Sequence, residues 1–218
     1  MHGAHGQGGL GDALARSEFI LGGQKSGKSR RAELLARQWL EQGAGHRAVL
    51  IATAQPWDEE MRQRIARHQA DRALRVPGMT TVEEPLALAK AIAQHSDDRT
   101  LVVVDCLTLW LTNCLMPVEE PLTSAAGVAS GLPKNSGSNM PLALVERAQA
   151  APLLIAIANT RGPVVLVGNE IGLGVIPMGA QVRAFVDALG KLNQDVAATC
   201  RRVTLMAAGL PLTLKDVP

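Results

Sequence analysis

Residues 22–29 read Gly-Gly-Gln-Lys-Ser-Gly-Lys-Ser, and this run decides the fold that the rest of the chain has to complete. It fits the pattern G-x-x-x-x-G-K-[ST], in which glycines let the backbone curl until successive N–H groups point at phosphate oxygens. The mostly apolar residues 18–21 predict a strand before it, and residues 28–40 predict an amphipathic helix after it. The positive end of that helix favours phosphate. This strand–loop–helix context distinguishes a phosphate-binding loop from a glycine-rich turn that merely resembles one.

Each position of this loop has a chemical task in binding a nucleoside triphosphate. Lys28 would reach the β and γ phosphates, and the Ser29 hydroxyl would ligate Mg²⁺. The remaining positions would surround the phosphates with backbone donors; they are Gly22, Gly23, Gln24, Lys25, Ser26 and Gly27.

Apolar bursts alternate with helical patterns along the chain, which predicts an α/β fold with a mostly parallel sheet and helices on both faces. We expect one nucleotide-binding catalytic domain over residues 18–218, after a disordered leader at 1–17 and with a flexible insertion at about 117–139. Pro152 would kink or split one helix. Beyond the phosphate loop, strands are expected at 48–52, 80–82, 101–104, 163–167, 202–206 and 212–214, and helices at 58–72, 85–94, 107–115, 142–159 and 182–199.

Composition excludes several kinds of protein. The 218 residues carry 22 Lys+Arg against 20 Asp+Glu and only five Phe or Trp, so neither charge nor base stacking gives reason to expect nucleic acid as a partner. Charged residues and proline interrupt the best apolar stretches, so no membrane span is expected. The three cysteines form no C-x-x-C pair, which predicts reduced, mostly buried thiols and a cytoplasmic protein.

Asp105 ends the apolar strand expected over 101–104, and two roles are open for it. A carboxylate at this place in a P-loop fold belongs to the magnesium site, directly or through water. It could instead be the N-cap of the helix that follows. The phosphate loop favours the metal role.

His68 lies at the edge of the apolar face of the helix expected over 58–72. Arg64, Arg67 and Arg72 surround it and would attract a polyphosphate. By itself, a lone histidine of this kind is more often a packing or surface residue than a catalytic one.

Two further stretches are much more particular than the phosphate loop: Arg64-Ile-x-x-His68 and Asn169-Glu-Ile-Gly-Leu-Gly-Val-Ile-Pro177. With them, the sequence resembles the bifunctional adenosylcobinamide kinase/adenosylcobinamide-phosphate guanylyltransferases of cobalamin biosynthesis. The matching pieces follow the order of that family and span nearly the whole chain; they are residues 21–30, 51–55, 58–72, 81–85, 105–113 and 165–177.

The resemblance implies a RecA-like P-loop domain, a homotrimer with its site near subunit boundaries, and His68 as the residue that becomes guanylylated. It implies that ATP or GTP with Mg²⁺ phosphorylates adenosylcobinamide, and that GTP then guanylylates adenosylcobinamide phosphate. Lys28 would support both reactions. Besides the phosphate loop, the implied nucleotide contacts are Ile51, Ala52, Thr53, Gln69, Ala70, Asp71, Arg72, Glu83 and Asp105.

The sequence departs from the family's pattern in two places. Residues 117–139 are longer and more polar than usual, and residues 74–79 replace a run that commonly bears tryptophan. Two other functions stay open at this point: a different P-loop small-molecule kinase, in which His68 is structural, and a nucleotide-sensing protein without transferase chemistry.

Overall fold

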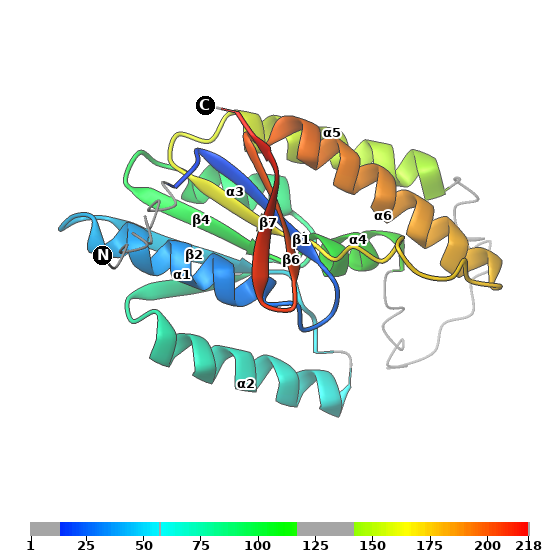
Figure 1. Cartoon of the computed structure of the whole chain (residues 1–218), viewed down its shortest axis with the longest axis horizontal. Coiled ribbons are helices and arrows are strands. Elements are labelled where there is room, and N and C mark those ends of the chain that lie inside the picture. The colour runs from blue at the N-terminus through cyan, green and yellow to red at the C-terminus, as the bar shows by residue number, and fades with distance from the viewer. Residues whose placement is uncertain (1–13, 57, 117–141, 218) are drawn as a thin grey trace, which may run out of the picture.

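A single seven-stranded sheet forms the centre of the computed structural model, which describes residues 14–56, 58–116 and 142–217, and only the backbone for 142–148 (Figure 1). The strand order is β3-β2-β4-β5-β1-β6-β7, and every neighbouring pair is parallel except β6 and β7. The strands are β1 (Ser17–Gly22), β2 (Arg47–Ala52), β3 (Met79–Glu83), β4 (Thr100–Asp105), β5 (Val164–Val167), β6 (Arg202–Ala207) and β7 (Leu210–Asp216).

Helices cover both faces of the sheet, so the expected α/β architecture is confirmed (Figure 1). The buried side chains of α3, α4, α5 and α6 pack with one face of the strands, and those of α1 pack with the other. The helices are α1 (Lys28–Glu41), α2 (Glu59–Arg75), α3 (Leu88–His95), α4 (Leu107–Leu115), α5 (Leu142–Ala158) and α6 (Ala180–Thr199).

The central strands β4, β5 and β1 are buried almost throughout because both of their faces are covered, and β4 and β5 are also apolar almost throughout. Their register sets the carboxyl ends level: Val167 of β5 pairs with Asp105 of β4 on one side and with Ile20 of β1 on the other. The loops that leave these strands therefore emerge side by side at one edge of the sheet.

The bounds of several elements differ from those expected. Helix α3 begins at Leu88 rather than at Pro85, because Glu84 Oε1 accepts hydrogen bonds from the N–H groups of Leu86 and Ala87 and forms a turn before the helix. Helix α2 continues to Arg75. Helix α5 runs through Pro152 as one helix, so of the two outcomes expected there, a kink or a split, the split was wrong.

The disordered leader expected at 1–17 falls largely on residues 1–13, which lie outside the described residues, as does the insertion expected at 117–139. Strand β1 begins at Ser17, which is already buried. Among the described residues, every helix falls short of the length and apolarity needed to cross a membrane.

The three cysteines are free thiols, as expected. Cys106 and Cys200 are buried and Cys114 is half-buried. Burial raises the pKa of Cys106 and Cys114 to about 11 and that of Cys200 to about 12, so all three stay protonated at neutral pH.

Candidate nucleotide-binding site

The loop between β1 and α1 has the backbone geometry of a phosphate cradle, and two of its glycines are required by that geometry. Gly27 caps α1 in the left-handed region, with φ of 102°, where side chains are disfavoured. At Gly22, a Cβ would come within 2.5 Å of the carbonyl oxygen of Met206 and 2.6 Å of Ser26 Oγ. The predicted strand–loop–helix context is therefore confirmed, with the loop packed tightly against the end of β6.

Two side chains of this loop are arranged to receive an anion. Lys28 is buried, and its Nζ donates a hydrogen bond to the carbonyl oxygen of Gly23 at 2.6 Å. Burial lowers the pKa of Lys28, while the nearby Cys106 and Asp105 oppose that fall. The buried Ser26 Oγ has no hydrogen-bond partner among the described residues. A phosphate would offer acceptors to both groups.

Asp105 stands at the carboxyl end of β4, half-buried and close enough to Lys28 and Arg72 to oppose the fall in their pKa values. The N-cap position of α4 belongs to Cys106, without a capping side chain, so the alternative reading of Asp105 as an N-cap was wrong.

The residues at this edge fit Mg²⁺ bound together with a triphosphate. Ser29 lies in the first turn of α1 and supplies a hydroxyl, and Asp105 supplies a carboxylate. Within the described residues there is no group of three or more His, Cys, Asp or Glu that could hold a metal ion. Mg²⁺ suits such a sparse donor set, because it keeps several waters and takes the rest of its ligands from substrate phosphates.

Of the nucleotide contacts expected at the end of β2, Ile51 and Thr53 have side chains that are buried inside the protein. Ile51 is fully buried in the core, and Thr53 is also fully buried. Thr53 Oγ1 accepts a hydrogen bond from the N–H of Cys106 at 2.9 Å and donates one to the carbonyl of Cys106 at 2.7 Å. The Thr53 side chain therefore fixes the junction of β4 and α4, while Ile51 belongs to the core and Ala52 is half-exposed.

The C-terminal half of α2 is fixed to β3 and α1 by polar contacts. Gln69 Nε2 donates to Glu83 Oε1 at 3.4 Å, and Arg72 Nη1 donates to Thr81 Oγ1 at 3.2 Å. One turn later, Arg75 pairs with Glu33 of α1 at 2.6 Å and with Asp71 at 2.9 Å. The structure thus gathers Gln69, Asp71, Arg72 and Glu83 of the expected nucleotide contacts, with Ala70 exposed between them.

His68 lies on the exposed surface of α2, four residues before Arg72 and so on the same stripe of the helix. No residue of α2 is buried, and the expected apolar face is reduced to the half-buried Met61 and Ile65. Arg72 connects this stripe with the carboxyl end of the sheet: burial lowers the pKa of Arg72, and the nearby negative charge of Asp105 opposes that fall. No hydrogen bond or ion pair among the described residues joins His68 to the phosphate loop.

The loop after β5 adds residues to which the sequence analysis gave no role. The N–H of Glu170 donates to the carbonyl of Gly22 at 3.1 Å, at the root of the phosphate loop. The N–H of Asn169 donates to Thr108 Oγ1 at 2.9 Å, and its carbonyl accepts from Asn193 Nδ2 at 3.1 Å. An Asn-Glu pair shortly after a buried strand is a signal of the same kind as Asp105, and it could have been found in that way.

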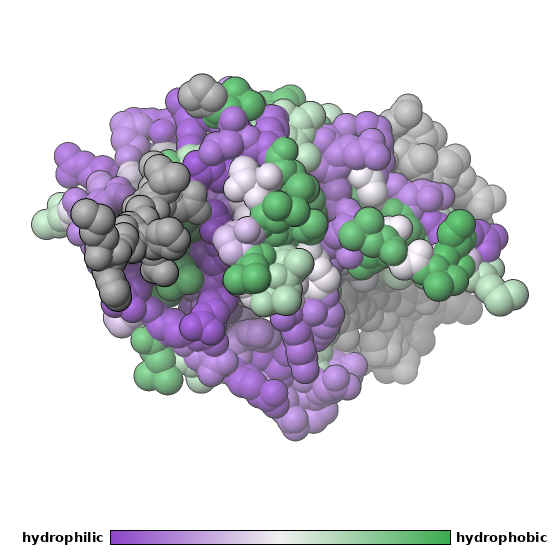
Figure 2. Space-filling model, viewed as in Figure 1, coloured by the Kyte–Doolittle hydropathy of each residue, from purple (hydrophilic) through white to green (hydrophobic). Residues whose placement is uncertain are grey.

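Beyond Glu170 the chain exposes a continuous set of apolar side chains before α6. Leu173, Val175 and Met178 are 82%, 95% and 96% exposed, and Ile176 is 78% exposed. Figure 2 shows apolar surface in this region, and a second apolar area over β7. Contiguous exposed apolar surface of this kind marks an interaction site more often than it marks ordinary surface.

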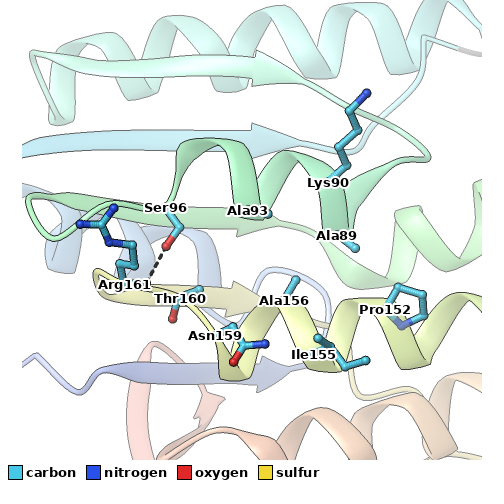
Figure 3. A pocket seen from close by; sticks show the side chains of 10 residues that line it. All are labelled: Ala89, Lys90, Ala93, Ser96, Pro152, Ile155, Ala156, Asn159, Thr160 and Arg161. Atoms are coloured by element: carbon cyan, nitrogen blue, oxygen red, sulfur yellow. Dashed lines mark hydrogen bonds between the residues drawn. The ribbon is translucent and has the colours of Figure 1, made fainter.

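A pocket of about 410 Å³ lies between α3 and α5, away from this edge (Figure 3). Its lining includes Ala93, Ile155 and Arg161, and the N–H of Arg161 donates to Ser96 Oγ at 2.7 Å. Ser96 and Arg161 belong to the loops that precede β4 and β5, so this pocket faces the amino ends of those strands. It is not part of the candidate nucleotide site.

The fold and this edge define a P-loop nucleotide-binding α/β protein. Residues 18–214 match the family described as cobinamide kinase / cobinamide phosphate guanyltransferase. The chain belongs to that family, as its motifs predicted.

Two bifunctional proteins of known name agree with this assignment. The chain is 41% identical over 201 residues to the bifunctional adenosylcobalamin biosynthesis protein CobP of Pseudomonas aeruginosa, covering 92% of this chain and 98% of the relative. It is 29% identical over 200 residues to the bifunctional adenosylcobalamin biosynthesis protein CobU of Escherichia coli, with 90% and 98% covered. Among solved structures, the flagellar accessory protein FlaH of Methanocaldococcus jannaschii matches with a TM-score of 0.46 at 12% identity, covering 94% of this chain and 80% of that one.

Proposed function

We propose that this chain catalyses two successive reactions: phosphorylation of adenosylcobinamide, and transfer of GMP from GTP to adenosylcobinamide phosphate to give adenosylcobinamide-GDP. The observation that carries the proposal is a family match that takes in both the phosphate loop and the helix bearing His68. GTP or ATP donates the phosphoryl group in the first reaction.

In the kinase reaction the loop mainly positions the triphosphate and stabilises its charge. Lys28 Nζ leaves the carbonyl of Gly23 and binds phosphate oxygens, while the backbone donors of the loop surround the β phosphate. Ser29 and Asp105 would hold Mg²⁺, which would neutralise charge on the phosphates.

In the transferase reaction a ring nitrogen of His68 attacks the α-phosphorus of GTP. A P–N bond forms, the bond to the bridging oxygen breaks, and pyrophosphate leaves with its charge balanced by Lys28. A phosphate oxygen of adenosylcobinamide phosphate then attacks the same phosphorus, and the P–N bond breaks. An exposed imidazole supports this role, because both of its large partners have to reach it. The contacts of Gln69 and Arg72 would hold the adjacent turn beside the nucleotide.

The proposal extends to the assembly. The chain forms a homotrimer with its site near subunit boundaries, as the resemblance implies, and the exposed apolar side chains at residues 173–178 support an association of this kind. The cytoplasmic location rests on the free thiols.

Labelling with GTP that carries a radioactive α-phosphate tests the proposed roles. His68→Ala should abolish covalent labelling and leave measurable kinase activity, because the phosphate loop that binds the triphosphate is unchanged. Lys28→Ala should slow both reactions by about 100-fold or more, because both depend on binding of the triphosphate by Lys28.

The control is His95→Ala, which removes a histidine at the end of α3 and should label like the unaltered chain. Undiminished labelling of His68→Ala would remove His68 from the scheme. If Lys28→Ala keeps both rates, the two reactions do not share the phosphate loop.

A further inference from the structure

The sheet topology places one further carboxylate beside the phosphate loop. Strand β5 lies between β4 and β1, so the chain that leaves β5 emerges between Asp105 and Gly22. Glu170 comes three residues after the end of β5, and its N–H is bound to the carbonyl of Gly22. In open α/β sheets, ligands bind in the crevice outside the carboxyl ends of the strands, so Glu170 lies beside the place that a nucleotide in the loop would take.

Several elements fix the backbone around Glu170. The N–H of Gly168 donates to the carbonyl of Ile20 at 3.0 Å, and Asn169 is bound by Thr108 of α4 and Asn193 of α6. A Cβ at Gly168 would come within 2.8 Å of the buried ring of Phe19, so this close approach requires glycine. The carboxylate is therefore carried by a rigid segment.

One oxygen of Glu170 has a structural task and the other is available. Oε1 accepts a hydrogen bond from the N–H of Gly172 at 2.8 Å and closes a turn. Oε2 accepts no hydrogen bond from a protein donor within the described part of the chain. Glu170 is half-buried, so this oxygen remains accessible to a ligand.

We propose that Glu170 accepts the proton of the cobinamide hydroxyl during the kinase reaction; this rests on the function proposed above. As the hydroxyl oxygen forms its bond to the γ-phosphorus, the O–H bond breaks and the proton passes to Oε2. The bond between the γ-phosphorus and the bridging oxygen breaks, and the nucleoside diphosphate leaves. Lys28 donates only, and Asp105 is committed to Mg²⁺. Glu83 ends β3, which is four strands away from β1, whereas Glu170 follows β5, the neighbour of β1, so Glu170 is the better placed of the two to take the proton.

Glu170→Gln tests this assignment sharply, because the amide oxygen can still accept from Gly172 and the turn is kept. The kinase kcat should fall by about 100-fold with little change in the KM for the nucleotide. Covalent guanylylation of His68, which needs no such proton acceptor, should continue at the rate of the unaltered chain. Glu41→Gln, at the exposed end of α1, is the matched control and should leave both reactions unchanged.

Glu170→Ala separates a proton acceptor from a structural residue. Added formate supplies a carboxylate and should restore part of the kinase rate of this variant, which it would not do if Glu170 were only structural. A Glu170→Gln variant with a kinase kcat within twofold of the unaltered chain would overturn the inference, as would equal loss of kinase activity and His68 guanylylation. If the unaltered chain phosphorylates no cobinamide, the proposed function itself fails, and this outcome is separate from failure of the Glu170 assignment.

Discussion

At the scale of single residues, a buried charge ties the strand that carries the phosphate loop to its neighbours. Glu18 of β1 is fully buried, and its Oε1 accepts hydrogen bonds from Arg31 Nε of α1 and Thr204 Oγ1 of β6, both at 2.8 Å. The Arg31 side chain is only 13% exposed. Such a pair is costly to break from one side, because the remaining charge stays buried.

Glu18→Ala should therefore lower the free energy of unfolding by about 3 kcal/mol, measured by urea denaturation. Arg37→Ala is the matched control, since it breaks the exposed pair between Arg37 and Glu41 and should cost less than about 1 kcal/mol. Equal losses in the two variants would show that burial of the Glu18 pair has no consequence for stability.

Local sequence patterns predicted the strand–loop–helix context of residues 22–29, because the glycines, the lysine and the helix start all lie within eight consecutive positions. The place of Asp105 at the end of β4 was predicted for a similar reason, from the continuous apolar run before it, and its role in binding Mg²⁺ stays a prediction. Glu170 also follows a continuous apolar run, but its place beside Gly22 could not be predicted, because that place depends on the order of the strands.

At the scale of elements, the sheet and the helix α2 were predictable to different degrees. Strands β4 and β5 are buried on both faces and read as unbroken apolar runs. Helix α2 has no buried residue, and polar contacts hold it to α1 and β3. Contacts of this kind leave no hydrophobic periodicity, so its docking could not be predicted from the sequence.

An ion pair between Arg75 and Glu33 joins α2 to α1. Because Glu33 can be protonated, the packing of α2 against α1 depends on pH. Burial raises the pKa of Glu33, and Arg75 and Arg72 oppose the rise. Because the folded-state pKa lies above the ordinary value of 4.5, the folded state binds this proton more strongly than the unfolded state. The contribution of the raised pKa to stability is thus complete below pH 4.5 and is lost as the pH rises through the folded-state pKa.

Urea denaturation of the unaltered chain and of Glu33→Gln between pH 4 and 7 measures this effect. The difference in unfolding free energy, unaltered chain minus variant, should fall as the pH rises from about 4.5, because the amide of the variant has no proton to lose in this range. A difference that grows with pH would mean that Arg75 outweighs burial.

At the scale of the whole molecule, the parallel sheet brings the ends of β1, β4 and β5 to one edge. Residues that are distant in the chain, namely Gly22, Asp105 and Glu170, meet there. Sequence periodicity predicted a parallel sheet, but it did not specify the strand order that produces this meeting. That His68 reaches the same edge is a prediction from the family resemblance. It depends on how α2 lies beside a bound nucleotide, in its own or an adjoining subunit.

In the proposed transferase reaction, the phosphate loop holds one triphosphate while His68 takes its guanylyl group. The most direct measurement is the mass of the intact chain after incubation with GTP and Mg²⁺, followed by trypsin digestion at mildly alkaline pH, where a P–N bond survives. Cleavage after Arg67 and Arg72 releases the peptide His68–Arg72, which contains a single histidine. We predict an increment of one GMP on this peptide, lost on acid treatment; a GMP adduct on another peptide, or turnover of cobinamide phosphate without any adduct, would contradict the account.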